Sequence, residues 1–122
     1  MTRDVREHSI MIANLAYDEG REFGSKTRPA FVLKYDNEII SYYNITSQFS
    51  SKSDYYQSKY FEIKDWAYSG LNKPSWIDTF KIRQVEEEYV VINFVGYLSS
   101  QDEARFIDFL TGIKYDVLSI EI

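Results

Sequence analysis

The strongest structural constraint in the sequence is a pair of neighbouring runs that favour β-strands. Residues 30–35 and 38–46 are rich in β-branched and aromatic side chains, and little more than Asp36-Asn37 lies between them. This arrangement predicts a tight turn and a β-hairpin. Pro29 stands directly before the first run, and since proline is not accommodated in the middle of a paired strand, we expect it to precede the strand.

Further short segments favour strands along most of the chain: 9–15, 59–63, 79–85 and 88–97. The last of these is the most hydrophobic and is expected to be central in the sheet. With five to seven short strands and one or two helices, the chain is predicted to be mainly β (α+β). We expect a small, strongly bent β-barrel that carries a helix.

One segment has the features of a regular helix. Ser100 and Glu103 form an S-x-x-E capping box, which predicts a helix start at Ser100. Apolar residues then recur at helical spacing and form one face: Phe106, Phe109 and Leu110. Gly112 is expected to end the helix in a left-handed cap.

Two shorter segments give weaker signals. Residues 63–71 are expected to contain a helical turn that ends at Gly70, and residues 117–122 have a strand-like composition.

Composition limits the classes of protein and of site that the chain can form. Its 122 residues are 44% apolar and 17% aromatic, which predicts one domain over residues 1–122 around one core. The absence of cysteine excludes a disulfide framework, a zinc knuckle and a cysteine nucleophile, and the single histidine, His8, cannot form a histidine cluster. The longest apolar run, 89–98, is too short to span a bilayer, and Asp4 and Glu7 argue against a secretory signal. We therefore expect a soluble, cytoplasmic protein.

Charge is distributed unevenly along the chain, whose net charge is −5. Residues 1–84 carry a net charge of +1 and residues 85–122 one of −6, with Glu86–Glu88 as the densest acidic run, for which a solvated turn is the expected structure. The acidic balance disfavours non-specific nucleic-acid binding. Residues 21–28 are locally basic, so an anion site remains open there.

The first candidate binding segment is residues 24–29, Gly-Ser-Lys-Thr-Arg-Pro. Glycine and serine let a backbone approach an anion, Lys26 adds a point charge, and Arg28 offers a planar fork that suits phosphate oxygens. The alternative is an ordinary polar loop that enters a strand, because the pattern lacks the second glycine of a P-loop.

The second candidate segment lies at the end of the hairpin's return strand. Thr46, Ser47 and Gln48 can direct hydrogen bonds into a cleft, or they can simply form an ST-turn.

The third candidate segment, residues 48–60, interleaves aromatic and basic side chains: Lys52, Tyr55, Tyr56, Lys59 and Tyr60. This pattern can stack single-stranded bases and neutralise phosphates. The alternative is an exposed loop whose tyrosines cover the core.

The remaining polar and aromatic candidates give weaker signals. Asp18, Glu19 and Glu22 could surround a hydrated divalent ion, although their spacing does not support one. His8 is expected to be exposed to solvent. The two tryptophans are expected to pack in the core or an interface: Trp66 and Trp76.

In combination, these motifs resemble the MazF/PemK family of toxins from type II toxin–antitoxin systems. The order G-S-K-T-R-P-A-F-V-L, a short turn and then I-T-S-Q carries the resemblance, together with the D-W-x-x-x-G-L-x-K-P-S stretch at 65–75. Gly96 to Ser99 and the helix that follows keep the family's order, so the similarity covers about residues 10–110. The chain departs from the family at His8-Ser9, where a Gly-Asp pair is common, and in its acidic net charge.

The resemblance implies an SH3-like barrel that forms a homodimer and cleaves single-stranded RNA without a metal or other cofactor. The family's essential arginine and threonine fall on Arg28 and Thr46, and Lys26, Ser47 and Gln48 are the expected substrate contacts. The 2′-hydroxyl would attack the neighbouring phosphate and leave 2′,3′-cyclic phosphate and 5′-hydroxyl ends. A cognate antitoxin is the implied protein partner. Two alternatives are a catalytically inactive barrel that binds protein or nucleic acid, and a single-stranded nucleic-acid binder that uses the tyrosine–lysine segment.

Overall fold

The computed structural model describes residues 6–19 and 22–121 of the chain. These residues form seven strands, two α-helices and one 3₁₀ helix in the following order: β1 (Ser9–Glu19), β2 (Glu22–Asp36), β3 (Ile39–Thr46), α1 (Asp54–Gln57), β4 (Tyr60–Ile63), β5 (Ser75–Asp78), β6 (Arg83–Glu86), η1 (Glu87–Tyr89), β7 (Ile92–Tyr97) and α2 (Ser100–Glu121). The predicted class, mainly β with two helices, is confirmed.

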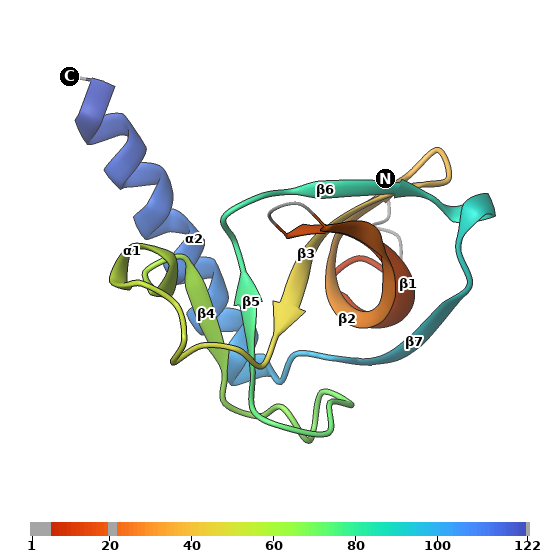
Figure 1. The fold of residues 1–122 in the computed structure, drawn as a ribbon. Helices are drawn as coiled ribbons and strands as arrows, with labels where there is room; N and C mark the ends of the chain where they lie inside the picture. The colour runs from red at the N-terminus through yellow and green to blue at the C-terminus, as the bar shows by residue number, and fades with distance from the viewer. Residues whose placement is uncertain (1–5, 20–21, 122) are drawn as a thin grey trace.

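The strands form one antiparallel sheet that bends strongly, with β1 and β2 curled at its centre (Figure 1). Its order is β4-β5-β3-β2-β1-β7, and β6 pairs with the first half of β3. In the described part of the chain, the outer strands β4 and β7 do not pair with each other, so the hydrogen-bonded sheet does not close into a complete barrel.

β7 is an edge strand, and the prediction of a central strand at 88–97 is wrong. It pairs with β1, and Phe94 and Tyr97 expose 42% and 51% of their surface. The first residues of the predicted strand instead form η1, which contains Glu87 and Glu88 as the expected solvated turn. Hydrophobic composition alone therefore does not place a strand inside a sheet.

The hairpin of β2 and β3 is confirmed, and its turn has a clear backbone cause. Asn37 and Glu38 have φ angles of 51° and 65°. Positive φ at both central residues is the requirement of a type I′ turn, whose twist matches that of the strands. The pairing runs from Asp36 and Ile39 beside the turn to Ala30 and Asn44, with a one-residue shift of register between Val32 and Lys34.

Pro29 lies within β2, so the expectation that it would precede the strand is wrong. The strand begins at Glu22, and Pro29 pairs with Ile12 of β1. β3 pairs with β2 only from Ala30 onward, so at Pro29 the strand has a neighbour on one side. A strand that has a neighbour on one side only can accommodate a proline, because a nitrogen on the other side needs no partner.

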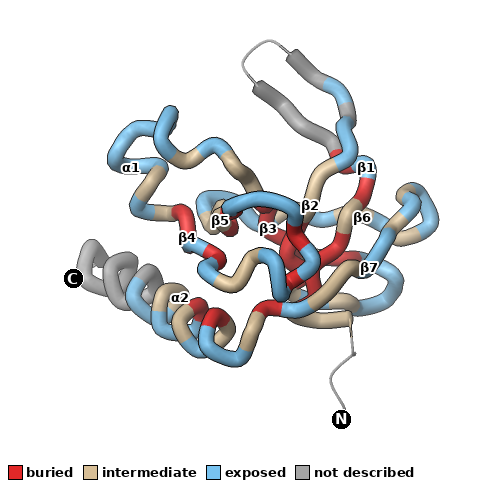
Figure 2. Tube along the Cα trace, turned by 90° about the horizontal axis from the view of Figure 1, so that it is seen from below, coloured by how far each residue is buried: buried red, intermediate tan, exposed pale blue. Residues whose placement is uncertain are grey.

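Alternate residues of the central strands supply two hydrophobic clusters, one on each face of the sheet. Ile10, Phe31 and Tyr43 belong to the cluster that α2 covers through Phe106. The residues of the opposite face form the second cluster: Met11, Ala13, Leu15, Ala30, Val32, Ile40 and Tyr42. Figure 2 shows the buried residues gathered where β1, β2 and β3 meet, whereas α1 is exposed.

The start of α2 differs by one residue from the predicted capping box. The backbone N–H of Asp102 donates to Ser99 Oγ at 3.1 Å, so Ser99 is the cap and not Ser100. Glu103 contacts His8 instead of closing a capping box.

The end of α2 also differs, because the helix continues through Gly112 to Glu121. A left-handed cap needs positive φ, and Gly112 is not among the described residues that have it. The strand predicted at 117–122 is therefore wrong as far as Glu121, and Ile122 lies outside the described residues.

The predicted helical turn before Gly70 is confirmed. Gly70 has a φ of 89° and donates its N–H to Ala67 O at 3.2 Å, while Leu71 donates to Trp66 O at 3.0 Å. This pair of bonds is a Schellman motif, in which glycine takes the left-handed position.

The strand predicted at 79–85 is shorter, and a strand that the sequence analysis missed precedes it. β5 ends at Asp78, whose Oδ1 accepts the N–H of Phe80 at 2.9 Å and turns the chain. The next strand, β6, starts only at Arg83. The strand predicted at 59–63 is confirmed as β4.

Within the described part of the chain, no helix is long and apolar enough to cross a membrane.

Candidate active site

Arg28 and Thr46 occupy facing positions at the end of the β2–β3 ladder. The last pair of this ladder joins Ala30 to Asn44. Arg28 lies two residues before Ala30, and Thr46 lies two residues after Asn44. Because side chains alternate between faces with a period of two, Arg28 and Thr46 share the face of Ala30 and Asn44.

Separate strand partners hold the two residues beyond the last pair. Arg28 pairs with Ala13 of β1, and Thr46 pairs with Trp76 of β5. Each residue therefore has a fixed backbone at the point where β2 and β3 part. The side chain of Arg28 is half-buried, with its Nε enclosed.

The hydroxyl of Thr46 is held by the chain that follows it. Thr46 Oγ1 accepts the backbone N–H of Gln48 at 3.0 Å, which is the ST-turn that the sequence also allowed. This bond uses one of the two lone pairs, so the O–H can still donate to a ligand. Ser47 is half-buried and Gln48 is exposed beside it.

The guanidinium of Arg83 adds a second positive charge on the face of the sheet that carries Arg28. Tyr42 pairs with Arg83 of β6 and lies two residues before Asn44. Burial raises the pKa of the Tyr42 hydroxyl above 10.0, against the lowering effect of the positive charges of Arg83 and then Arg28. Tyr42 therefore stays protonated at neutral pH, and both arginines lie within electrostatic range of it.

Asn44 adds a buried polar group between Tyr42 and Thr46. Its side chain is 7% exposed, and its Oδ1 has no hydrogen-bond partner among the residues that the structure describes. The sequence analysis missed Tyr42, Asn44 and Arg83 as neighbours of Arg28. The alternation of basic residues with other side chains around Arg83 is visible in the sequence, but the pairing of Arg83 with β3 depends on a long-range contact.

Residues 24–29 form a strand and not the loop that both interpretations of this segment assumed. Gly24 to Pro29 pair with Tyr17 to Ile12 of β1 in an unbroken register. The backbone is thus part of a ladder, and anion binding here depends on side chains. Lys26 is exposed and shares the face of Arg28, from which it is two residues away; the side chain of Ser25 lies outside the described residues.

A scan against protein-family models matches residues 6–106 to the family described as the PemK-like, MazF-like toxin of type II toxin–antitoxin systems. The chain belongs to this family. The match contains Arg28 and Thr46 and ends within α2. No curated protein matches the chain.

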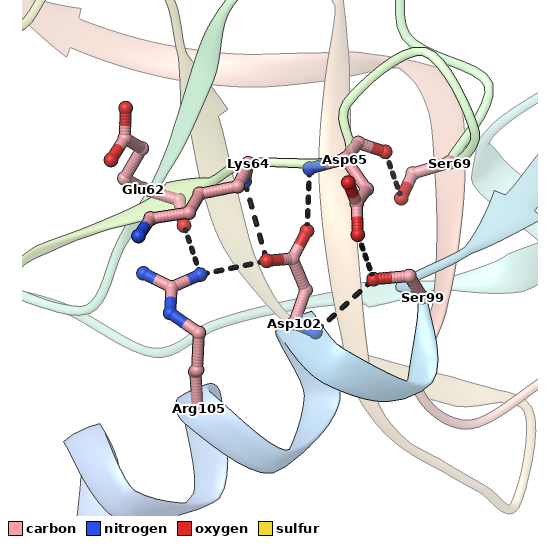
Figure 3. Close-up of polar contacts among 7 residues, drawn as sticks. All are labelled: Glu62, Lys64, Asp65, Ser69, Ser99, Asp102 and Arg105. Atoms are coloured by element: carbon pink, nitrogen blue, oxygen red, sulfur yellow. Dashed lines mark hydrogen bonds and ion pairs between the residues drawn. The ribbon is translucent and has the colours of Figure 1, made fainter.

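In the toxin, the segment that contains the D-W motif serves to join the turn after β4 to α2 (Figure 3). The carboxylate of Asp102, 1% exposed, accepts the backbone N–H groups of Lys64 at 3.3 Å and Asp65 at 2.8 Å. Arg105 donates to the same carboxylate at 2.7 Å, and Ser99 Oγ donates to Asp65 Oδ2 at 2.6 Å. These contacts give the motif a structural role in positioning the helix.

His8 of the toxin is half-buried, whereas the sequence analysis expected an exposed side chain. Its ring stacks on Phe31 at 5.6 Å, and Nδ1 lies 3.1 Å from Glu103 Oε1. Phe31 packs on the face of the sheet opposite to the cluster of Ala30 and Val32. His8 is therefore on the other side of the sheet from Arg28.

The other candidates of the sequence analysis have these positions in the toxin. Trp66 packs against the core, as expected, and Trp76 is half-buried and stacks on Phe49 at 4.9 Å. The described residues contain no group of acidic or histidine side chains that could hold a metal ion. The side chains of the predicted carboxylate cluster lie outside the described residues: Asp18, Glu19 and Glu22.

Proposed function

We propose that this toxin is a metal-independent, sequence-specific endoribonuclease that cleaves single-stranded RNA. The facing placement of Arg28 and Thr46 on one side of the sheet is the observation that carries the proposal. Membership of a toxin family whose members are generally ribonucleases supports it.

The chemistry needs few groups from the protein because RNA carries its own nucleophile. The 2′-hydroxyl gives up its proton as its oxygen attacks the adjacent phosphorus, and the 5′-oxygen leaves and takes up a proton, so the net transfer is one proton from the 2′- to the 5′-oxygen. The products are a 2′,3′-cyclic phosphate and a 5′-hydroxyl. A protein can accelerate this reaction through positioning and through stabilisation of the charge on phosphorus.

Arg28 and Thr46 supply complementary hydrogen-bond donors to that phosphate. The guanidinium of Arg28 binds two non-bridging oxygens as a planar fork, which suits the increased negative charge of the five-coordinate state. The O–H of Thr46 donates to one of the same two oxygens and adds a second direction of hydrogen bonding to it. Arg28 stays protonated throughout, so it acts as an electrostatic group and not as a base.

The neighbouring polar residues hold the RNA on either side of the cleaved bond. Lys26 extends the positive charge along β2, and Ser47 and Gln48 present a hydroxyl and an amide directly after Thr46. Arg83 adds positive charge on the same face. We assign substrate contact to Lys26, Ser47 and Gln48.

The proposed partners are a cognate antitoxin in the cytoplasm and a second copy of this chain. In the described residues β7 pairs with β1 alone, and it presents exposed apolar side chains beside an open edge. An open edge of this kind can pair with another chain, which supports a homodimer.

The test is RNA cleavage by purified protein in excess EDTA. Arg28→Ala is expected to lower the rate about 10²–10³-fold. Thr46→Val is expected to cause a comparable loss, whereas Thr46→Ser keeps the hydroxyl and most of the activity. Lys34→Ala, which removes an exposed cation further along β2, is the matched control.

Product ends distinguish the proposal from its alternatives. Cuts that leave 2′,3′-cyclic phosphate and depend on Arg28 and Thr46 would support it. A folded protein that binds several diverse RNAs without cutting them would favour the inactive, nucleic-acid-binding barrel. Equal cleavage by Arg28→Ala and the parent would overturn the assignment of this residue.

A further inference from the structure

Three aromatic side chains form an exposed cluster, and we call Tyr55, Tyr56 and Phe80 the aromatic platform. Tyr55 and Tyr56 belong to α1, and Phe80 belongs to the turn after β5. Their ring centroids lie 5.7, 6.2 and 5.2 Å apart. The three residues nevertheless remain 61%, 43% and 49% exposed.

Hydrogen bonds to backbone carbonyls join the two segments of the platform and tie α1 to the chain that precedes it. Thr79 donates its N–H and its hydroxyl to Lys59 O, at 2.9 and 2.6 Å. Gln57 Nε2 donates to Phe49 O at 3.1 Å and to Lys52 O at 3.2 Å. The two segments therefore hold the rings close together, although the rings are too exposed for hydrophobic burial to account for their position.

A short series of contacts links the platform to Thr46. Thr46 pairs with Trp76, the ring of Trp76 stacks on Phe49, and Phe49 O is bound by Gln57, next to Tyr56. A ligand that leaves the Thr46 end of the candidate active site can follow this route to the platform.

The charges around the platform favour an anionic ligand. Lys59 Nζ lies 5.9 Å from the centroid of the Tyr55 ring, and Lys52 and Lys81 are exposed in the same two segments. These segments are locally basic in a chain of net charge −5. An apolar protein surface would fit the β7 edge better, since Val91 and Phe94 are exposed there.

We propose that the aromatic platform stacks bases of the single-stranded RNA outside the cleaved position, with the lysines on the flanking phosphates. Exposed rings with adjacent cations are the usual means of binding single strands without sequence readout. The inference rests on the proposed function, because it extends the path of the RNA beyond Arg28 and Thr46.

Binding is measured separately from cleavage, with a fluorescein-labelled random pool of 2′-O-methyl RNA. This probe has no free 2′-hydroxyl and cannot be cut by the proposed chemistry. Tyr55→Leu and Phe80→Leu are each expected to weaken binding about five- to hundredfold, the loss of one stacked base. Tyr68→Leu is the matched control, because Tyr68 is 74% exposed and lies in the turn after β4.

A second measurement needs no substitution. The pool is resynthesised with 5-iodouridine, irradiated with the parent protein and digested, and the cross-linked residues are identified by mass spectrometry. Cross-links to Tyr55, Tyr56 or Phe80 are expected.

The outcomes separate the platform from the ribonuclease proposal. Platform-dependent binding by a protein that never cuts RNA would support the platform and overturn the enzyme. Cleavage by a protein whose platform variants bind like Tyr68→Leu, with cross-links elsewhere, would overturn the platform alone. The platform is equally overturned if the parent does not bind the pool.

Discussion

Arg28 and Thr46 stand opposite each other where β2 and β3 part, each two residues beyond the Ala30–Asn44 pair. One strand pair thus sets both the spacing and the common face of the two side chains. Neither residue depends on a loop for its position, because β1 holds one and β5 holds the other. A site on strands of this kind is suited to chemistry that works by fixed charge.

Arg28→Lys tests whether the planar fork matters or only the positive charge. Lysine keeps the charge but cannot bind two phosphate oxygens as a fork. We expect cleavage to fall by about 10² while binding of 2′-O-methyl RNA changes little. Single-turnover cleavage and fluorescence anisotropy on the same protein check this. Full activity in Arg28→Lys would reduce the role of Arg28 to that of a point charge.

Local signals in the sequence were sufficient to predict the hairpin that carries the candidate site. The hairpin could be predicted because residues 30–46 carry its strands and its turn within one short segment. The position of Thr46 follows from the place where the second strand of the hairpin ends. The strand start predicted from Pro29 was wrong. A proline is compatible with a strand wherever one side of the strand lacks a partner, and whether β2 has such a side at Pro29 depends on where β3 ends.

Signals from distant contacts could not be read from the sequence. β7 is hydrophobic yet lies at an edge, because pairing with β1 decides its place. Ser99 and Ser100 are equivalent as caps by composition, and the structure shows that Ser99 Oγ accepts the N–H of Asp102, whose carboxylate in turn binds the turn after β4. Phe80 joins Tyr55 and Tyr56 across segments that the sequence analysis had assigned to a loop and a strand.

Asp102→Ala is expected to destabilise the fold strongly. It removes the acceptor of two backbone N–H groups and of Arg105, all at a carboxylate that is 1% exposed. We expect a loss of about 3 kcal/mol in the free energy of unfolding, measured in urea. Asp108→Ala, an exposed position on the same helix, should change it by less than about 0.5 kcal/mol. If the alanine variant does not fold, Asp102→Asn should show an intermediate loss; parental stability in that variant would contradict the assigned role.

Stability is expected to fall at alkaline pH through the buried tyrosines. Burial raises the pKa of Tyr42 above 10.0, against Arg83 and Arg28, and burial also raises the pKa of Tyr43. As pH rises, these hydroxyls ionise in the unfolded chain before they do in the folded one, so stability present below pH 10.0 is lost above it. Urea unfolding from about pH 8 to pH 11 measures the slope. Tyr42→Phe should make it shallower, and an unchanged slope would exclude Tyr42 as a source.

Two glycines should respond to alanine in opposite directions. Gly70 has a φ of 89°, and an added Cβ would lie 2.5 Å from Val95 O, so Gly70→Ala is strained both in its backbone and in its packing. We expect a loss of about 2 kcal/mol or more in the free energy of unfolding. Gly112 lies inside α2, and among the described residues no atom beyond the neighbouring helix backbone lies within 4 Å of an added Cβ, so alanine there should stabilise the helix by about 0.5 kcal/mol. Thermal and urea unfolding of both variants check the pair. Equal effects of the same sign would show that Gly112 is not in a helix in solution, or that the turn at Gly70 relaxes to accept a side chain.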